Sequence, residues 1–224
     1  MNRPSTQYLK ILESIHSKAI SCGRNPNEIT LVAVTKKHSL DEVEDLYDQG
    51  CRQFGESRLQ EALPKIEAGP PNISWHYIGP LQKNKVLRDV QNFSWIHSID
   101  TPDLAWKVSN CAAAEHKKIK CLLQVNTSGE STKQGLSPKA WESLFVEIKN
   151  LPFLEWEGVM TMAPLTDDES VIRHSFRELR EFRDHLAQLY NHPFFHLSMG
   201  MSNDYLIAIE EKSTILRIGT ALFS

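Results

Sequence analysis

The stretch TLVAVTKKHSLDEVEDLYDQG, residues 30–50, contains one complete strand–helix unit. Its first five residues are apolar or β-branched, which predicts a short buried strand over 30–34. Ser39 and Glu42 have the spacing of a capping box, and apolar residues then recur at helical intervals. Gly50 follows the predicted helix, in the position where glycine commonly ends one.

The same alternation of strand and helix recurs along the rest of the chain. Further strands are predicted at 53–55, 75–78, 93–99, 120–126, 157–160, 194–198 and 214–218. Thr101-Pro102 and Ser137-Pro138 each place a capping residue before a proline at the first position of a predicted helix. Eight strands that alternate with helices favour an α/β fold, a closed parallel (β/α)8 or TIM barrel, over an open doubly wound sheet.

One extra helix is predicted before the barrel. Tyr8, Ile11, Ile15 and Ala19 recur at helical spacing, so residues 1–22 form this opening element. The barrel then occupies residues 29–224, which is close to the lower size limit of such folds. No linker or low-complexity segment divides the chain, and we therefore expect a single domain over residues 1–224.

Composition narrows the class of protein. A net charge of −3 and a hydrophobic fraction of 41% are ordinary for a soluble globular chain and give no reason to expect a nucleic-acid partner. No apolar run approaches the ~20 residues that span a bilayer. The cysteines form no C-x-x-C pair, and no two of His76, His97 and His196 are spaced like metal ligands, so we expect a cytoplasmic protein without a metal site.

Lys36 is the first candidate for chemistry, because barrel active sites lie at the C-terminal ends of the strands. Side chains alternate along a strand, so Lys36 shares a face with Val32 and Val34. If that face is the inner one, Lys36 points into the mouth of the barrel. Partial desolvation there would favour the neutral, nucleophilic amine that Schiff-base chemistry needs. A solvated pair with Lys37 is the plainer alternative, and spacing alone favours it.

The loops after the last two predicted strands suggest a phosphate site. Ser198-Met199-Gly200-Met201-Ser202 follows the seventh strand, and Gly219-Thr220 follows the eighth. Each loop supplies a glycine for close backbone approach and then a hydroxyl. Phosphate sites of barrels are frequently built from these two loops, although each stretch alone could be a plain turn.

Arg217 shares a strand face with Ile215 and Gly219. If this face is the inner one, a permanent cation lies near the barrel centre, where it is costly without a ligand or partner. A structural ion pair with one of the many acidic residues is the alternative explanation.

Seven stretches together resemble a known family. They are LVAVTKK, FGES, WHYIGPLQKNK, IHSID, VNTSGESTKQG, LSMGMSNDY and RIGTALF, in this order from about residue 29 to the end. The chain resembles the pyridoxal phosphate homeostasis proteins, the YggS/PROSC family. This resemblance implies a (β/α)8 barrel that binds pyridoxal 5′-phosphate (PLP) and is similar to the N-terminal domain of alanine racemase.

The resemblance also implies roles for individual residues. Lys36 corresponds to the lysine that forms a Schiff base with PLP. Ser202, Gly219 and Thr220 correspond to groups that hold the phosphate. Arg217 corresponds to the arginine facing the pyridine nitrogen, which then stays unprotonated and makes the ring a weaker electron sink.

The remaining residues implied for the site are Ile78, Gly79, Ser198, Gly200 and Met201, which border the cofactor. Lys133 lies in a family loop that contacts free PLP, with a plain surface lysine as the alternative. Two departures stand out. Ser57 occurs where the family usually has asparagine, so a contact of that asparagine is not transferred, and the chain ends at Ser224 without the short basic tail common in relatives.

Three functions fit these residues. The resemblance implies a carrier and regulator of PLP that delivers it transiently to apo-enzymes, with no turnover and no catalytic residues. We expect a monomer, since we see no extra domain for pairing. An amino-acid racemase is the alternative, but it needs acid and base groups on both faces of the substrate, and we see no residues left for the second domain that supplies one. A Schiff-base aldolase on a sugar phosphate would use Lys36 without PLP and be colourless.

Overall fold

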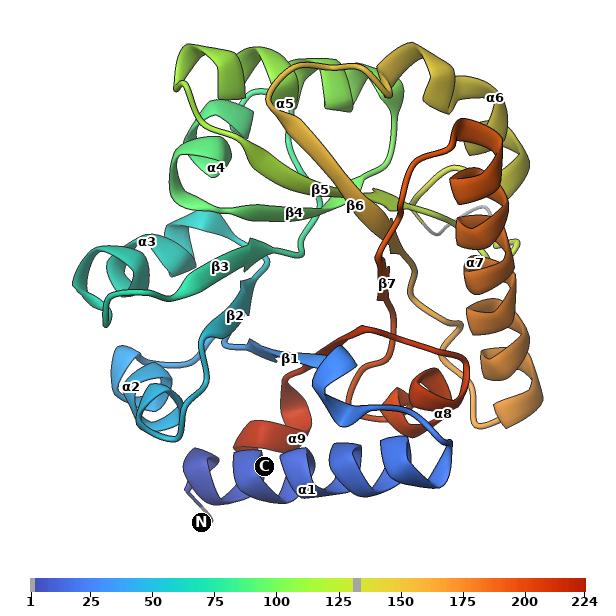
Figure 1. Cartoon of the computed structure of the whole chain (residues 1–224). Helices are drawn as coiled ribbons and strands as arrows, with labels where there is room; N and C mark the ends of the chain where they lie inside the picture. Colours follow the sequence, from blue (N-terminus) through green and yellow to red (C-terminus); the bar gives the residue numbers. More distant parts are fainter. Residues whose placement is uncertain (1–2, 131–133) are drawn as a thin grey trace.

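The computed structural model describes residues 3–130 and 134–224. Within them, eight parallel strands close into a barrel in chain order (Figure 1). The strands are β1 (Thr30–Val34), β2 (Gln53–Glu56), β3 (Ser74–Tyr77), β4 (Trp95–Ile99), β5 (Ile119–Gln124), β6 (Leu154–Met160), β7 (His196–Ser198) and β8 (Ile215–Ile218). Because β8 pairs in parallel with β1, the sheet has no free edge, and the predicted TIM barrel is confirmed.

Helices surround the barrel on the outside (Figure 1). They are α1 (Pro4–Ser21), α2 (Leu40–Asp48), α3 (Leu59–Ala68), α4 (Val86–Asn92), α5 (Pro102–Ala114), α6 (Pro138–Ile148), α7 (Glu169–Tyr190), α8 (Tyr205–Glu210) and α9 (Thr220–Phe223), with a 3-10 turn η1 (Pro26–Glu28) before β1. The extra opening helix is therefore confirmed as α1, which contacts the C-terminal α8 and α9. Among the described residues, no helix is long and apolar enough to cross a membrane.

Local sequence signals set the helix starts as predicted. The Ser39 hydroxyl accepts a hydrogen bond from the Glu42 N–H, and the Glu42 carboxylate accepts one from the Ser39 N–H at 2.7 Å. Thr101 and Ser137 cap α5 and α6 through their hydroxyls, each directly before a proline. Gly50 adopts φ +94° after α2, a conformation that glycine reaches without steric cost.

Strand boundaries differ from the prediction where pairing or proline intervenes. β6 begins at Leu154, three residues before the predicted start, because its first residues pair with Ile119 and its neighbours on β5. β7 begins at His196, two residues later than predicted, since Pro193 precedes it and Phe195 is 62% exposed. β4 begins at Trp95 rather than Phe93, and β5 ends at Gln124 rather than Asn126.

The interior of the barrel has an apolar floor and a polar layer. Val32, Leu122, Met160 and Ile215 form a separate buried cluster, while Ala33 belongs to the larger core between strands and helices. Val32 and Ile215 therefore point inward, which is the orientation that the arguments for Lys36 and Arg217 assumed. The barrel strands also carry buried polar side chains, among them His76 on β3, His97 on β4, Ser198 on β7 and Arg217 on β8. Branched apolar residues usually fill this position in barrels, so the polar set calls for an explanation.

Candidate functional site

Lys36 lies in the turn directly after β1, at the C-terminal end of the barrel. Its side chain is exposed, so the predicted partial desolvation is wrong. The physical reason is that β1 ends at Val34. The chain then turns, with the His38 N–H donating to the Thr35 carbonyl at 3.0 Å, and Lys36 leaves the alternation of the strand. What remains is an accessible primary amine at the mouth of the barrel.

Directly below Lys36, three buried polar groups fix the end of β1. The Thr35 hydroxyl donates to Glu56 Oε1 at 2.7 Å, and Lys65 Nζ donates to the same oxygen and to the Thr35 carbonyl at 2.8 Å. Glu56 ends β2, and Lys65 reaches in from α3. Sequence reasoning missed this clamp. The available signal was Lys65 itself, which shares a helical face with Leu59 and Ala62.

The loops after β7 and β8 meet as predicted. The Ala221 N–H donates to the Ser202 hydroxyl at 3.1 Å, and the Arg217 N–H donates to the Gly200 carbonyl at 2.9 Å. Gly200 has φ +98°, and a Cβ there would lie 2.6 Å from Ala208 Cβ, so only glycine fits this turn.

The register of β1 and β8 brings these loops next to Lys36. Val32 pairs with Arg217, so Gly219 lies beside Val34, where a Cβ on Gly219 would be 3.3 Å from Val34 Cβ. Just beyond, the His38 ring stacks on Phe223 of α9 with centroids 3.6 Å apart. The structure therefore brings together the lysine turn and both predicted phosphate loops.

Arg217 is a buried cation inside the barrel, 5% exposed. Its Nη1 donates to the Ser198 hydroxyl at 2.6 Å and its Nη2 to the Thr161 carbonyl at 2.9 Å. Among the described residues, no carboxylate lies within 4.0 Å of the guanidinium, so the structural ion pair is not supported. Burial lowers the pKa of Arg217 to about 10, against the opposing charge of Asp204, and the group stays charged at neutral pH.

Ile78 and Gly79 line the same end of the barrel after β3. Ile78 Cδ1 lies 3.3 Å from the place of a Cβ on Gly55, close to Val34, so it reaches the inner face. A Cβ on Gly79 would lie 2.2 Å from the Ser57 carbonyl oxygen, and the Gly79 carbonyl accepts a hydrogen bond from Ser98 at 2.6 Å. Glycine is thus required where these two loops cross.

Met201 and Thr220 are exposed at the rim, beside the half-buried Ser202 and Gly219. Lys133 lies outside the described residues. The described part of the chain contains no cluster of three or more histidine, cysteine or acidic residues that could hold a metal ion.

A hollow of about 450 Å³ adjoins Ser57, between the loops after β2 and β3. Asp89 of α4 lines it, yet both carboxylate oxygens are buried and have no hydrogen-bond partner among the described residues. Burial raises the pKa of Asp89 to about 6, although Lys85 and Arg88 act in the opposite direction. The folded state therefore carries an unfavourable charge at neutral pH.

We expect Asp89→Asn to stabilise the fold at pH 7 by about 1–3 kcal/mol. Folding raises the pKa of this carboxyl, so its ionisation lowers the stability of the protein as pH rises. The unfolded carboxyl ionises near its ordinary pKa of 3.8 and the folded one near 6, so the gain should be full above pH 6 and vanish below pH 4. Urea unfolding above pH 6 and below pH 4 measures the difference in unfolding free energy between the variant and the parent protein. Asp103→Asn, at an exposed carboxylate, is the control, and equal effects of both variants would contradict the prediction.

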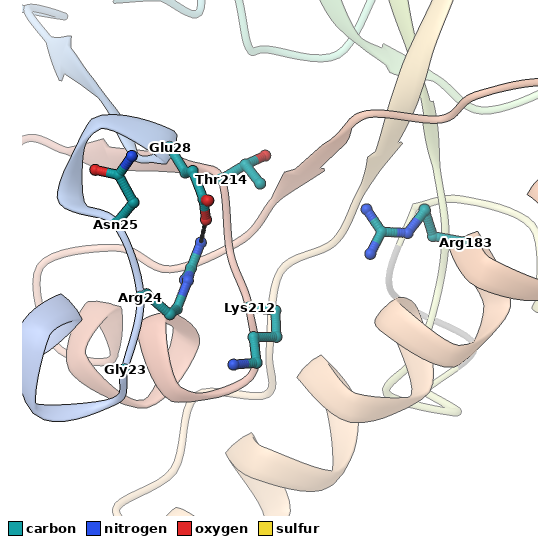
Figure 2. Close-up of a pocket in the computed structure, with 7 residues that line it drawn as sticks. All are labelled: Gly23, Arg24, Asn25, Glu28, Arg183, Lys212 and Thr214. Atoms are coloured by element: carbon teal, nitrogen blue, oxygen red, sulfur yellow. Dashed lines mark ion pairs between the residues drawn. The ribbon is translucent and has the colours of Figure 1, made fainter.

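A second hollow of about 360 Å³ lies at the opposite end of the barrel, before β1 and β8 (Figure 2). Arg24, Arg183 and Lys212 contribute positive charge to its lining. Arg24 donates to the Ile209 carbonyl at 2.9 Å. It also forms an ion pair of 3.9 Å with Glu28, and a dashed line marks this pair in Figure 2. Barrel active sites lie at the other end, so we assign this hollow no part in the site.

The fold and the site define a class of protein. Over residues 23–224 the chain matches the family described as alanine racemase, N-terminal domain. Alanine racemase of Clostridium difficile is 13% identical, with a TM-score of 0.78 over 95% of this chain and 58% of that one, which shows the shared fold.

Two relatives are more similar. The pyridoxal phosphate homeostasis protein of Aquifex aeolicus is 39% identical over 96% of this chain and 94% of its own length. The structure of PipY from Synechococcus elongatus with PLP bound is 32% identical, with a TM-score of 0.84 over 94% of this chain and 100% of that one. The chain belongs to the family of pyridoxal phosphate homeostasis proteins.

Proposed function

We propose that this chain binds PLP, with Lys36 as its covalent anchor, and acts in the cytoplasm as a carrier and regulator of this cofactor. The observation that carries the proposal is Arg217, a buried cation whose charge no carboxylate within 4.0 Å balances in the described part of the chain. A ring nitrogen that accepts a hydrogen bond suits such a group, because within the described part of the chain Ser198 and Thr161 accept from two of the five guanidinium N–H groups.

The other residues fit the remaining parts of PLP. When bound, the cofactor supplies an aldehyde that condenses with a primary amine and releases water. Lys36 offers an exposed amine at the mouth of the barrel. The phosphate is assigned to Ser202, Gly219 and Thr220, whose loops are joined by the hydrogen bond from the Ala221 N–H.

The sides of the site are assigned to the residues that flank Lys36, Arg217 and the two phosphate loops. Ile78 and Gly79 border the ring from the loop after β3, and Gly200 and Met201 border the phosphate. Ser198 holds Arg217 through a hydrogen bond of 2.6 Å. With all these residues on one domain, the whole chain serves as the cofactor-binding unit.

A carrier fits Arg217 better than a racemase does. A guanidinium beside the ring nitrogen keeps that nitrogen unprotonated, since two cations repel, and an unprotonated ring stabilises a carbanion weakly. We therefore propose no turnover. We also propose that the chain is a monomer that meets apo-enzymes transiently when it delivers PLP.

The absorbance spectrum of the purified protein, before and after borohydride, tests the cofactor. We expect a yellow protein whose visible band disappears on reduction, with a pyridoxyl group on Lys36 by peptide mass mapping. A protein that stays colourless with added PLP would contradict the proposal and favour the aldolase alternative. Chiral chromatography of alanine incubated with the holo-protein tests turnover, and measurable racemisation would contradict the carrier role.

A further inference from the structure

A chain of hydrogen bonds, buried except at the Gln53 end, crosses the barrel beneath Arg217. Arg217 Nη1 donates to Ser198 Oγ at 2.6 Å, and Ser198 Oγ lies 3.0 Å from His97 Nδ1. His97 Nε2 then lies 2.9 Å from His76 Nδ1, and His76 Nε2 lies 2.8 Å from Gln53 Oε1. Five of the eight strands contribute one member each, so the chain connects opposite walls of the barrel.

The hydrogen bonds have one consistent direction. Arg217 can only donate, so Ser198 Oγ accepts there and its own proton is directed to His97 Nδ1. A neutral His97 that accepts at Nδ1 donates from Nε2 to His76 Nδ1, and His76 donates from Nε2 to the Gln53 amide oxygen. The reverse direction would leave the Ser198 hydroxyl proton without an acceptor among the described residues.

Both rings are neutral in this arrangement. Burial lowers the pKa of His76 to about 3, and nearby His196 and Lys120 act in the same direction. Burial also places the pKa of His97 far below its ordinary value, with His76, Arg217 and His196 adding repulsion. A neutral imidazole has one donor and one acceptor nitrogen, which is what the direction of the chain requires.

The packing holds the chain in place. His97 is fully buried, and Trp95 stacks on the His76 ring with centroids 5.2 Å apart and an angle of 11°. Two histidines in the core of a barrel replace the branched apolar residues that usually fill it. A buried polar group is costly unless it is hydrogen-bonded. We therefore expect this hydrogen-bond chain to orient the group at its far end. That far end is the Ser198 hydroxyl against Arg217.

We propose that His97 is a positioning residue of the cofactor site, because it fixes the Ser198 hydroxyl so that its lone pair faces the Arg217 guanidinium, and that His76 accepts from Nε2 of His97 and thereby keeps Nδ1 of that ring an acceptor. They act through Ser198 and do not touch the cofactor. This inference rests on the proposed function, in which Arg217 faces the ring nitrogen of PLP. It assigns to the barrel core a role in setting the electronic state of the bound cofactor.

Two substitutions of His97 separate positioning from bulk structure. His97→Leu removes the acceptor for Ser198, whereas His97→Asn places an amide oxygen close to the position of Nδ1 and keeps it. We expect His97→Leu to raise the PLP dissociation constant about tenfold, the size of one hydrogen bond, and to shift the pH midpoint of the visible absorbance band. His97→Asn should stay within about threefold of the parent protein with its midpoint unchanged.

His196→Asn is the matched control. His196 also lies in the barrel against Trp95, but its ring is hydrogen-bonded to Thr214 and to no member of the hydrogen-bond chain described above. We expect it to leave both PLP affinity and pH midpoint unchanged. Thermal unfolding of each apo-variant reports whether the fold is intact.

Nitrogen-15 NMR of the histidine rings in the parent protein gives a test that needs no variant. We expect His76 and His97 to be neutral and protonated at Nε2 from pH 5 to 8. Protonation at Nδ1 of either ring, or a charged ring, would overturn the proposed direction of the chain.

The outcomes separate this inference from the proposed function. If the parent protein binds no PLP, the proposed function fails. If the parent binds PLP but His97→Leu retains its affinity and pH midpoint, the positioning role fails while the proposed function stands. Equal losses in His97→Leu and His97→Asn would also overturn it, because the retained acceptor would then have no effect.

Discussion

Replacing Lys36 with alanine is expected to abolish the borohydride-stable pyridoxyl adduct completely. Lys36 is the exposed amine in the turn next to the loop that carries Gly219 and Thr220. Without it, PLP can be held only by the phosphate loops and Arg217, so it should dissociate during dialysis. The measurements are the visible absorbance after dialysis and intact mass after borohydride reduction, where the parent protein gains one pyridoxyl group and Lys36→Ala gains none.

Lys37→Ala is the control for this prediction. Lys37 is the exposed neighbour in the same turn, with φ +67°, and has no assigned contact with the cofactor. We expect it to keep the adduct and the visible band. A persistent adduct in Lys36→Ala, or its loss in Lys37→Ala, would show that the anchor is assigned to the wrong lysine.

The barrel could be predicted from sequence because the local signals for helix starts and for the existence of each strand agreed with the fold. The capping box at Ser39 and Glu42 and the caps before Pro102 and Pro138 lie where the helices start. Strand existence followed from short apolar runs. Strand ends did not, since pairing with Ile119 on β5 extends β6 to Leu154, and pairing partners are not visible in a single strand.

The site could be predicted only in part, for a related reason. Lys36 was found because it follows a predicted strand end, and Arg217 because side chains alternate along its strand. The exposure of Lys36 could not be predicted, because the turn after Val34 depends on a hydrogen bond from His38 to Thr35. The link between His76 and His97 was also out of reach, since their ring nitrogens meet only once β3 and β4 pair and both rings turn inward.

Removing the ammonium group of Lys65 is expected to destabilise the protein far more than the loss of an exposed ion pair does. Lys65 Nζ lies 2.5 Å from Glu56 Oε1 and both side chains are buried, with Glu56 fully so. In Lys65→Met the Glu56 carboxylate stays buried without its counter-charge, and the Thr35 carbonyl loses one of its two donors, keeping only the His38 N–H. Breaking such a pair from one side costs about 3–5 kcal/mol, which lowers the Tm of a domain of this size by roughly 10 °C.

Calorimetry of three further variants shows whether the buried charge is the cause. Lys118→Met breaks an exposed pair with Glu155 and should cost less than about 1 kcal/mol. Lys65→Met combined with Glu56→Gln removes the orphaned charge, so it should recover at least half of the lost stability. Glu56→Gln alone should be milder than Lys65→Met, because the amide oxygen still accepts from Thr35 and Lys65. If Lys65→Met and Lys118→Met had equal Tm values, Glu56 would not be held by Lys65, and the buried clamp would not support the turn that carries Lys36.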